Sequence, residues 1–292
     1  MVRRSNGEKI FAAFNVLFLS LLILITIYPF LHVFFASISD PTSLMKHTGL
    51  LYAPIGATLQ AYQSVLENPA ILSGYGNTLF YLIMGVIINM SFTVLGAFVL
   101  SRNKLFFKNF IMFLVVFTMF FSGGLIPLYL LARGIHISNT FWAVLLPPAI
   151  NTWNLIIMRT SFLSVPRGVE ESAKIDGAND FTVLLHVVIP LSLPVLVVIL
   201  LFYGVERWNA WFYAMIFLRD REKYPLQLIL REIVINSSVE SMTTGAGNTD
   251  RVPIGETIKY AAIMVATIPI ICVYPFLQKY FVKGVMVGAL KG

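Results

Sequence analysis

The sequence predicts an all-α membrane protein that crosses the bilayer as six transmembrane helices. Of its 292 residues, 58% are hydrophobic and only 12% are charged, whereas about a quarter of the residues in soluble domains are charged. Long uncharged intervals separate the charged residues, and six are apolar and long enough for a span, which needs about 20 residues. Backbone polar groups in lipid must be satisfied internally, so these spans are expected to be helices.

The six expected spans cover almost the whole chain in sequence order. They lie near residues 10–37, 77–100, 109–131, 139–158, 187–205 and 259–278. The first is too long for a signal-peptide core and no small-residue cleavage site follows it, so we expect it to be retained. The uncharged interval 47–66 is rich in polar residues, glycine and proline, and we expect a loop there. No internal repeat is evident, so residues 1–292 are expected to form a single membrane domain.

The distribution of charge predicts the orientation in the membrane. An even number of spans places both termini on one side, together with the loops at 101–108 and 159–180. That side carries twelve Lys and Arg against five acidic residues, whereas the other side carries nine of each. The positive-inside rule makes the basic side cytoplasmic. Residues 38–76 and 206–258 are then outer loops, and the basic net charge reflects topology rather than nucleic-acid binding.

The cytoplasmic loop at 164–186 is unusually polar for this chain, with EESAKIDGAND at 170–180. Pro166 suits a first helical turn, and Glu170 and Glu171 suit the start of the same helix because its dipole favours negative charge there. Gly177 stands where a left-handed residue would end that helix. Asn179 can cap a second helix that continues into the fifth span. We therefore expect a helix–turn–helix at the membrane surface.

The surface of this loop would be small and partly apolar, because Ala173, Ile175 and Ala178 lie within it. Such a surface suits insertion into a groove on another protein. The alternative interpretation is a solvated loop whose charges only keep it out of lipid.

The order of residues in the loop resembles the EAA loop of ABC importer permeases. Its usual form is EAAxxDGAxxxxxFxxIxLPxxxP, and this chain matches it from Glu171 to Pro194 with four mild substitutions, at Ser172, Leu184, Val187 and Ile189. The segment FYGVERWNAWFYAMIFL at 202–218 resembles the WNxFxxPLIFL segment of the sugar branch, although Ala214 replaces its usual proline. GNTL at 76–79 resembles a helix start in that branch. The resemblance extends to the C-terminal FVKGVMVGALKG.

The resemblance implies a type I ABC importer permease, similar to the smaller permease of the maltose type, in a bacterial inner membrane. It implies a heterodimer with a second permease, two ATPase subunits that bind ATP and Mg, and an extracytoplasmic sugar-binding protein. The substrate would be an oligosaccharide, in the subset that takes up alginate or pectin fragments. Coupling to the ATPase would fall to Glu170, Glu171, Ala173, Lys174, Asp176, Gly177 and Ala178.

The sequence predicts no catalytic residue, no metal site and no cofactor in this chain. It lacks a GK dipeptide and therefore the Walker A lysine, and it has neither HExxH nor GxSxG. Cys272 is the only cysteine, so we expect neither a disulfide framework nor a cysteine metal cluster.

Uncharged polar residues within the spans are candidates for a path taken by a hydrogen-bonding solute. These are Asn77, Asn89, Asn151, Trp153 and Asn154. The alternative for each is an interhelical hydrogen bond or an interfacial anchor. No acidic or basic residue lies in the middle of a span, which argues against the rival function, a stand-alone secondary transporter or channel.

Overall fold

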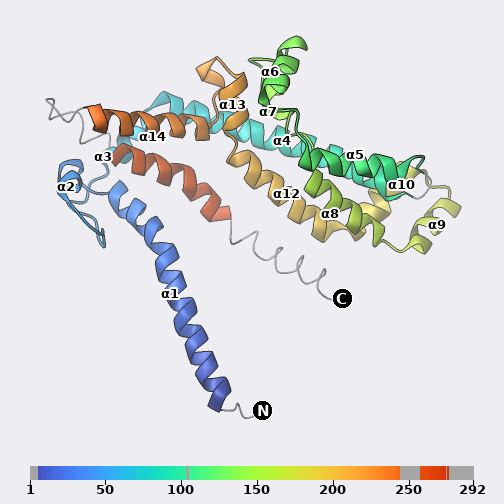
Figure 1. Ribbon diagram of the computed structural model, residues 1–292, viewed down its shortest axis with the longest axis horizontal. Helices are drawn as coiled ribbons and strands as arrows, with labels where there is room; N and C mark the ends of the chain where they lie inside the picture. Colours follow the sequence, from blue (N-terminus) through green and yellow to red (C-terminus); the bar gives the residue numbers. More distant parts are fainter. Residues whose placement is uncertain (1–5, 103–104, 244–256, 274, 276–292) are drawn as a thin grey trace. The chain divides into compact units, whose positions relative to one another are not determined.

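The computed structural model describes residues 6–102, 105–243, 257–273 and 275. All regular structure in these residues is helical, which confirms the all-α prediction (Figure 1). Two compact units form: one contains the described parts of 1–69 and 230–269, and the other those of 70–229 and 270–292. The single membrane domain stays a prediction.

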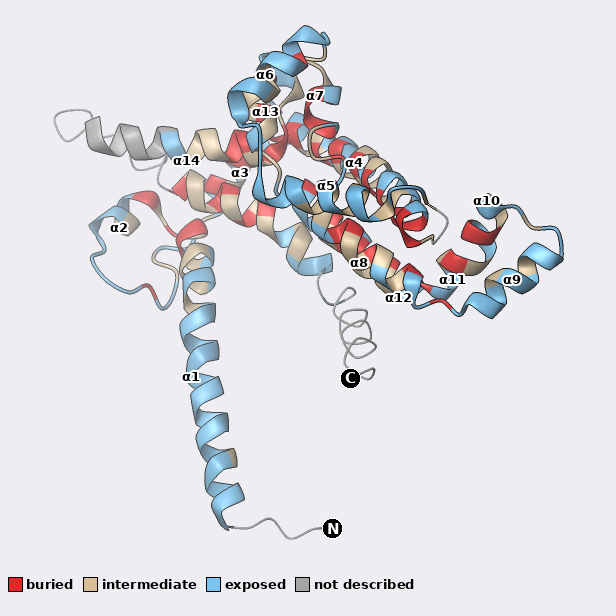
Figure 2. Cartoon of the chain, turned by 45° about the vertical axis from the view of Figure 1, so that its right-hand side comes forward, coloured by how far each residue is buried: buried red, intermediate tan, exposed pale blue. Residues whose placement is uncertain are grey.

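The first unit begins with α1 (Asn6–Ser37), a helix of 32 residues. None of the residues in its most apolar window is buried, and Figure 2 shows this exposure along most of its length. A helix that is apolar all round suits a lipid environment. Two short helices follow, α2 (Pro41–Lys46) and α3 (Gln60–Leu66). The expected loop at 38–76 is therefore partly helical, and it ends early because α4 (Pro69–Ser101) begins at Pro69.

The expectation of six continuous spans is only partly met. By length and composition, α1 and α4 could each cross a membrane unbroken. Two further candidates are bent pairs: α5 (Lys108–Phe120) with α6 (Leu125–Gly134), bent by 113°, and Asp180–Leu191 with α12 (Leu193–Trp208), bent by 87°. The expected span at 139–158 is interrupted between α7 (Phe141–Leu145) and α8 (Thr152–Leu163). The helix over 257–273 is apolar but shorter.

Each interruption coincides with residues that oppose a continuous helix. Gly124 has a φ of +86° between α5 and α6, a value that favours glycine. Pro147 and Pro148 follow α7 and provide no backbone N–H for helical hydrogen bonds. Pro194 lies at the start of α12, directly after the bend at Ser192, whose φ and ψ are −104° and 8°. Hydropathy carries little information on such breaks, so it predicts each of the six apolar intervals as one continuous helix.

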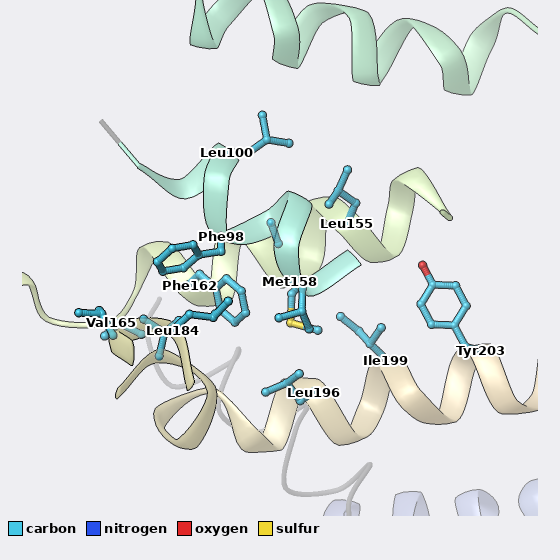
Figure 3. Packing of buried hydrophobic residues seen from close by; sticks show 14 residues of the cluster. Phe98, Leu100, Leu155, Met158, Phe162, Val165, Leu184, Leu196, Ile199 and Tyr203 are labelled. Carbon is cyan, nitrogen blue, oxygen red and sulfur yellow. The ribbon is translucent and has the colours of Figure 1, made fainter. Parts of the chain in front are cut away.

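The core of the second unit is an apolar cluster between α4, α8, α12 and the segment 183–188. Figure 3 shows Phe98, Met158 and Ile199 converging from three of these helices. In Figure 1, α8 lies beside both α5 and α12, as their contacts also show. The cluster therefore provides the rigid base from which the polar loop at 164–186 projects.

Candidate functional site

The loop at 164–186 folds into two helices joined by a tight turn. The first, α9 (Arg167–Ile175), follows Pro166, which lies just outside the helix rather than within its first turn. Gly177 has a φ of +86°, and the N–H of Ala178 donates to the carbonyl of Ala173 at 2.9 Å, as in a Schellman ending. The predicted left-handed ending of this helix at Gly177 is confirmed.

The second helix of the loop is also capped as predicted. The Asn179 side chain accepts a hydrogen bond from the N–H of Thr182 at 2.8 Å, at the start of α10 (Asp180–Val183). A π-helical turn over Leu184–Val188 and the short α11 (Ile189–Leu191) follow. This helix runs on to Leu191, inside the expected fifth span at 187–205, but the chain bends by 87° before α12, so that span is not one continuous helix.

One side of α9 is anchored and the other is open. Ala173 and Ala178 are partly buried against the apolar cluster. Glu171 and Asp176 are exposed, and Ile175 is 86% exposed although it is a large aliphatic residue. The open side therefore combines acidic groups with one apolar side chain at the end of the helix.

Lys174 does not extend freely from this open side. Its Nζ lies 2.6 Å from a carboxylate oxygen of Asp180, across the turn, and the two side chains are 49% and 69% exposed. Exposed ion pairs of this kind contribute little to stability, so a partner protein could separate them at small cost.

Glu170 points toward its own chain instead of outward. Its carboxylate forms an ion pair with Arg102, directly after α4, and its side chain is only 12% exposed. Sequence reasoning grouped Glu170 with the outward coupling residues and missed Arg102. The sequence offers one indication of this ion pair: Arg102 is the first charged residue after a long apolar span.

A second polar arrangement surrounds the break between α7 and α8. The guanidinium of Arg207 donates from Nε and Nη2 to Oδ1 of Asn89 at 3.0 and 2.7 Å. It also donates to the carbonyls of Val144, Leu145 and Pro148 at 3.1–3.2 Å. These carbonyls lie where a helix ends and lacks internal partners, and a cation is favoured there. Arg207 is only 3% exposed and therefore acts as an internal cap.

Asn89 completes this arrangement from α4. Its Nδ2 donates to the carbonyls of Pro148 and Ala149 at 2.7 and 3.1 Å, and its side chain is fully buried. Gly85 lies one turn earlier, where an added Cβ would come within 2.7 Å of Nε of Arg207. The polar atoms of Asn89 are thus used within the chain.

A second set of hydrogen bonds between α4 and α12 holds the start of α8. The hydroxyls of Thr93 and Tyr203 lie 2.7 Å apart, and the Tyr203 hydroxyl accepts from the N–H of Asn151 at 3.1 Å. Thr93 follows Asn89 by four residues on α4, and Tyr203 precedes Arg207 by four on α12. Both pairs therefore fall on one face of each helix, and together they hold both ends of the break.

The five candidate path residues fall into different environments. Asn151 caps α8 by accepting from the N–H groups of Trp153 and Asn154 at 3.0 and 3.3 Å. Asn154 is 3% exposed, whereas Trp153 is 61% exposed. Asn77 donates to the carbonyl of Tyr224 at 3.0 Å. Trp153 is the candidate whose side chain is most open to a ligand, and the role of all five in the path stays a prediction.

The segment between α13 (Phe212–Phe217) and α14 (Leu226–Thr243) is fixed by polar contacts. Asp220 accepts from Lys223 Nζ at 2.7 Å and from Asn139 Nδ2 at 3.0 Å. These two hydrogen bonds, together with the charge of Lys223, lower the pKa of the Asp220 carboxyl below its usual value. Within the described residues, no group of three or more His, Cys, Asp or Glu could hold a metal ion.

Comparison with known proteins identifies the family. A family model described as "Binding-protein-dependent transport system inner membrane component" matches residues 92–287. The chain belongs to this family. The resemblance read from residues 171–194 and 202–218 is therefore confirmed.

Two curated relatives of this permease come from Bacillus subtilis (strain 168). Protein LplC is 39% identical over 291 residues, which cover 100% of this chain and 98% of the relative. The polygalacturonan/rhamnogalacturonan transport system permease protein YtcP is 41% identical over 275 residues, 94% of this chain and 96% of the relative.

Solved structures agree with the family. A chain from a bacterial ABC transporter involved in the import of the acidic polysaccharide alginate matches with a TM-score of 0.85 and 34% identity, covering 96% of this permease and 100% of that chain. A chain from a bacterial alginate ABC transporter in complex with alginate pentasaccharide-bound periplasmic protein has a TM-score of 0.62 and 11% identity, covering 92% and 93%. The second match concerns the fold alone.

Proposed function

We propose that this permease forms half of the translocation pathway of an ATP-driven, binding-protein-dependent oligosaccharide importer. The observation that carries the proposal is the form of residues 164–186: a short helix with an exposed acidic and apolar side, ended by Gly177 and anchored on its other side to the apolar cluster. Such a projection is suited to entering a groove and to transmitting its movement to the helices behind it.

In this proposal the loop docks onto a separate ATPase subunit. Glu171 and Asp176 pair with basic groups on that subunit, and Ile175 enters its groove. ATP and Mg bind to two ATPase subunits, because this chain has no Walker A lysine. Closure of the ATPase pair moves α9, and Gly177 keeps the turn angle through which that movement passes to α10.

The proposal also includes the rest of the assembly, and membership of the family supports it. A second, related permease completes the pathway as a heterodimer, and an extracytoplasmic sugar-binding protein delivers the substrate. The chain would cross the membrane six times with both termini in the cytoplasm. The part of the outer loop at 219–258 would contact the binding protein. Its residues 244–256, like the C-terminal segment FVKGVMVGALKG, lie outside the described residues.

The proposed substrates are acidic oligosaccharides related to pectin or alginate fragments. The support is the pair of relatives whose printed names concern polygalacturonan and alginate, at 41% and 34% identity. Within the chain, Trp153 would present an aromatic face to a sugar ring, positioned by the cap that Asn151 forms at the start of α8.

Reconstitution of the complete complex in liposomes tests the proposal. Uptake of a labelled galacturonan oligosaccharide should require the binding protein, ATP and an active ATPase, and should stop when the ATPase is inactivated. Liposomes that contain this permease alone are the control. Uptake by the single chain without ATP would contradict the proposal and favour the secondary transporter or channel.

A further inference from the structure

An ion pair connects α9 to the residue that directly follows α4. Arg102 donates from Nη1 to the carboxylate of Glu170, and the two side chains are 25% and 12% exposed. A partly buried ion pair between an arginine and a carboxylate is directional as well as strong, so it can fix the position of one element against another.

Arg102 is itself held to the last turn of α4. Its Nε donates to the Ser101 hydroxyl at 3.2 Å, and its guanidinium carbon lies 4.3 Å from the centre of the Phe98 ring. Phe98 belongs to the buried apolar cluster. The Leu100 carbonyl also accepts from Nε of Arg159 on α8 at 3.0 Å. A force on Arg102 is therefore applied to the end of α4 and not to a loose side chain.

Packing alone leaves room for α9 to shift against α4. A hollow of about 390 Å³ lies beside the ion pair, lined by Ser101 and Arg102 on one side and by Arg167 and Glu171 on the other. The apolar contact of Ala173 with the cluster holds one part of α9, and beside the hollow the ion pair adds a direct link between α9 and the residue that follows α4.

We propose that Arg102 is a positioning residue for energy coupling, which binds α9 to α4 through Glu170 so that the two helices move together. Further along, α4 carries Asn89 and Thr93, whose contacts hold the break between α7 and α8. Movement of the loop would thus reach that break along one continuous helix. This inference rests on the proposed function, and it adds an internal linkage to the docking of α9.

Charge reversal in the complete reconstituted complex tests the linkage. The measured quantity is oligosaccharide uptake per ATP hydrolysed, because a merely structural defect lowers the amount of complex but not this ratio. We expect Arg102→Glu and Glu170→Arg each to lower the ratio at least fivefold while ATP hydrolysis continues. The double variant, in which the ion pair is reversed, should return the ratio to within about twofold of the wild type.

Arg133→Glu provides the matched control, since Arg133 is an exposed arginine in the last turn of α6. Its ratio should equal that of the wild type. If a single variant fails to assemble with the ATPase, Arg102→Gln and Glu170→Gln provide milder versions of the same test. Unchanged ratios in the single variants, or no rescue of ratio or assembly in the double variant, would overturn the inference. If the wild-type complex itself shows no ATP-dependent uptake, the proposed function is overturned instead.

Discussion

At the scale of single residues, the candidate coupling loop depends on backbone conformation as much as on charge. Gly177 adopts a φ of +86° with open space around it. Glycine is therefore needed at this position for its backbone conformation and not because a side chain would clash with a neighbour. A β-branched residue in this conformation costs about 1–2 kcal/mol, enough to shift the turn to another geometry without unfolding the helices on either side.

Gly177→Val should therefore uncouple ATP hydrolysis from transport. We expect uptake per ATP to fall several-fold, with the assembled amount of permease little changed. Gly134→Val is a suitable control, because Gly134 lies at the end of α6 with nothing near its Cβ position and no positive φ. Import at the normal rate by Gly177→Val would show that the turn does not act as a hinge.

At the scale of helices, the break between α7 and α8 requires a buried cation. Arg207 donates hydrogen bonds to three carbonyls and to Asn89. Removal of the guanidinium would take this donor from the carbonyls of Val144 and Leu145 and from Oδ1 of Asn89, and each unpaired buried group costs roughly 1–3 kcal/mol. The Pro148 carbonyl would keep its hydrogen bond from Nδ2 of Asn89. The break is therefore stable only while Arg207 of α12 donates hydrogen bonds to the carbonyls at the end of α7.

Arg207→Leu should destabilise the permease by about 3 kcal/mol or more, because several buried acceptors lose their donor. Thermal or denaturant unfolding of the protein in detergent measures this loss of stability. Arg133→Leu removes an exposed arginine and should have almost no effect. Equal stability of the Arg207 and Arg133 variants would contradict a capping role.

Gly85→Ala tests the same contact from the opposite helix. An added Cβ would lie 2.7–3.1 Å from three atoms of Arg207, so the guanidinium must move and its hydrogen bonds must weaken. We expect a lower melting temperature than for Gly204→Ala, because Gly204 has nothing within 4 Å of its Cβ position. No difference between the two variants would show that the contact at Gly85 is loose.

The segment between α13 and α14 should become less stable in acid. Hydrogen bonds from Lys223 and Asn139 lower the pKa of the Asp220 carboxyl from 3.8, so the folded state favours the charged form. This stabilisation is complete above the unfolded pKa and is lost as the pH falls through the lowered folded pKa. The stability advantage of the wild type over Asp220→Asn should therefore vanish in strong acid; an advantage independent of pH would contradict this.

The sequence predicted helices, caps and the loop turn well because these depend on local chemistry. Asn179, Gly177 and the apolar intervals each act within a few residues of themselves. The bends were missed because hydropathy does not register the glycine and prolines at which they occur. The buried contacts were missed because they depend on distant partners: Arg207 lies 118 residues from Asn89, and Glu170 lies 68 residues from Arg102. Pairings at such separations have no signature in a single sequence.

At the scale of the whole molecule, the permease has the features of a subunit and not of a self-contained transporter. α1 is apolar and exposed along most of its length, and α9 presents an open side with an 86% exposed isoleucine. Exposed apolar surface of this kind is covered by lipid or by other chains. These exposed surfaces agree with a chain that works within a larger complex, and in the proposed function α9 contacts the ATPase.

Site-specific cross-linking at residue 174 tests this assignment most directly. Lys174→Cys in a Cys272→Ser background leaves one cysteine in the chain, within the proposed docking loop. In native membranes, a bifunctional reagent should join this position to an ATPase subunit, whereas Arg133→Cys in the same background should not be joined to it. If the ATPase is never captured from residue 174 while it is present in the same membranes, the account is wrong.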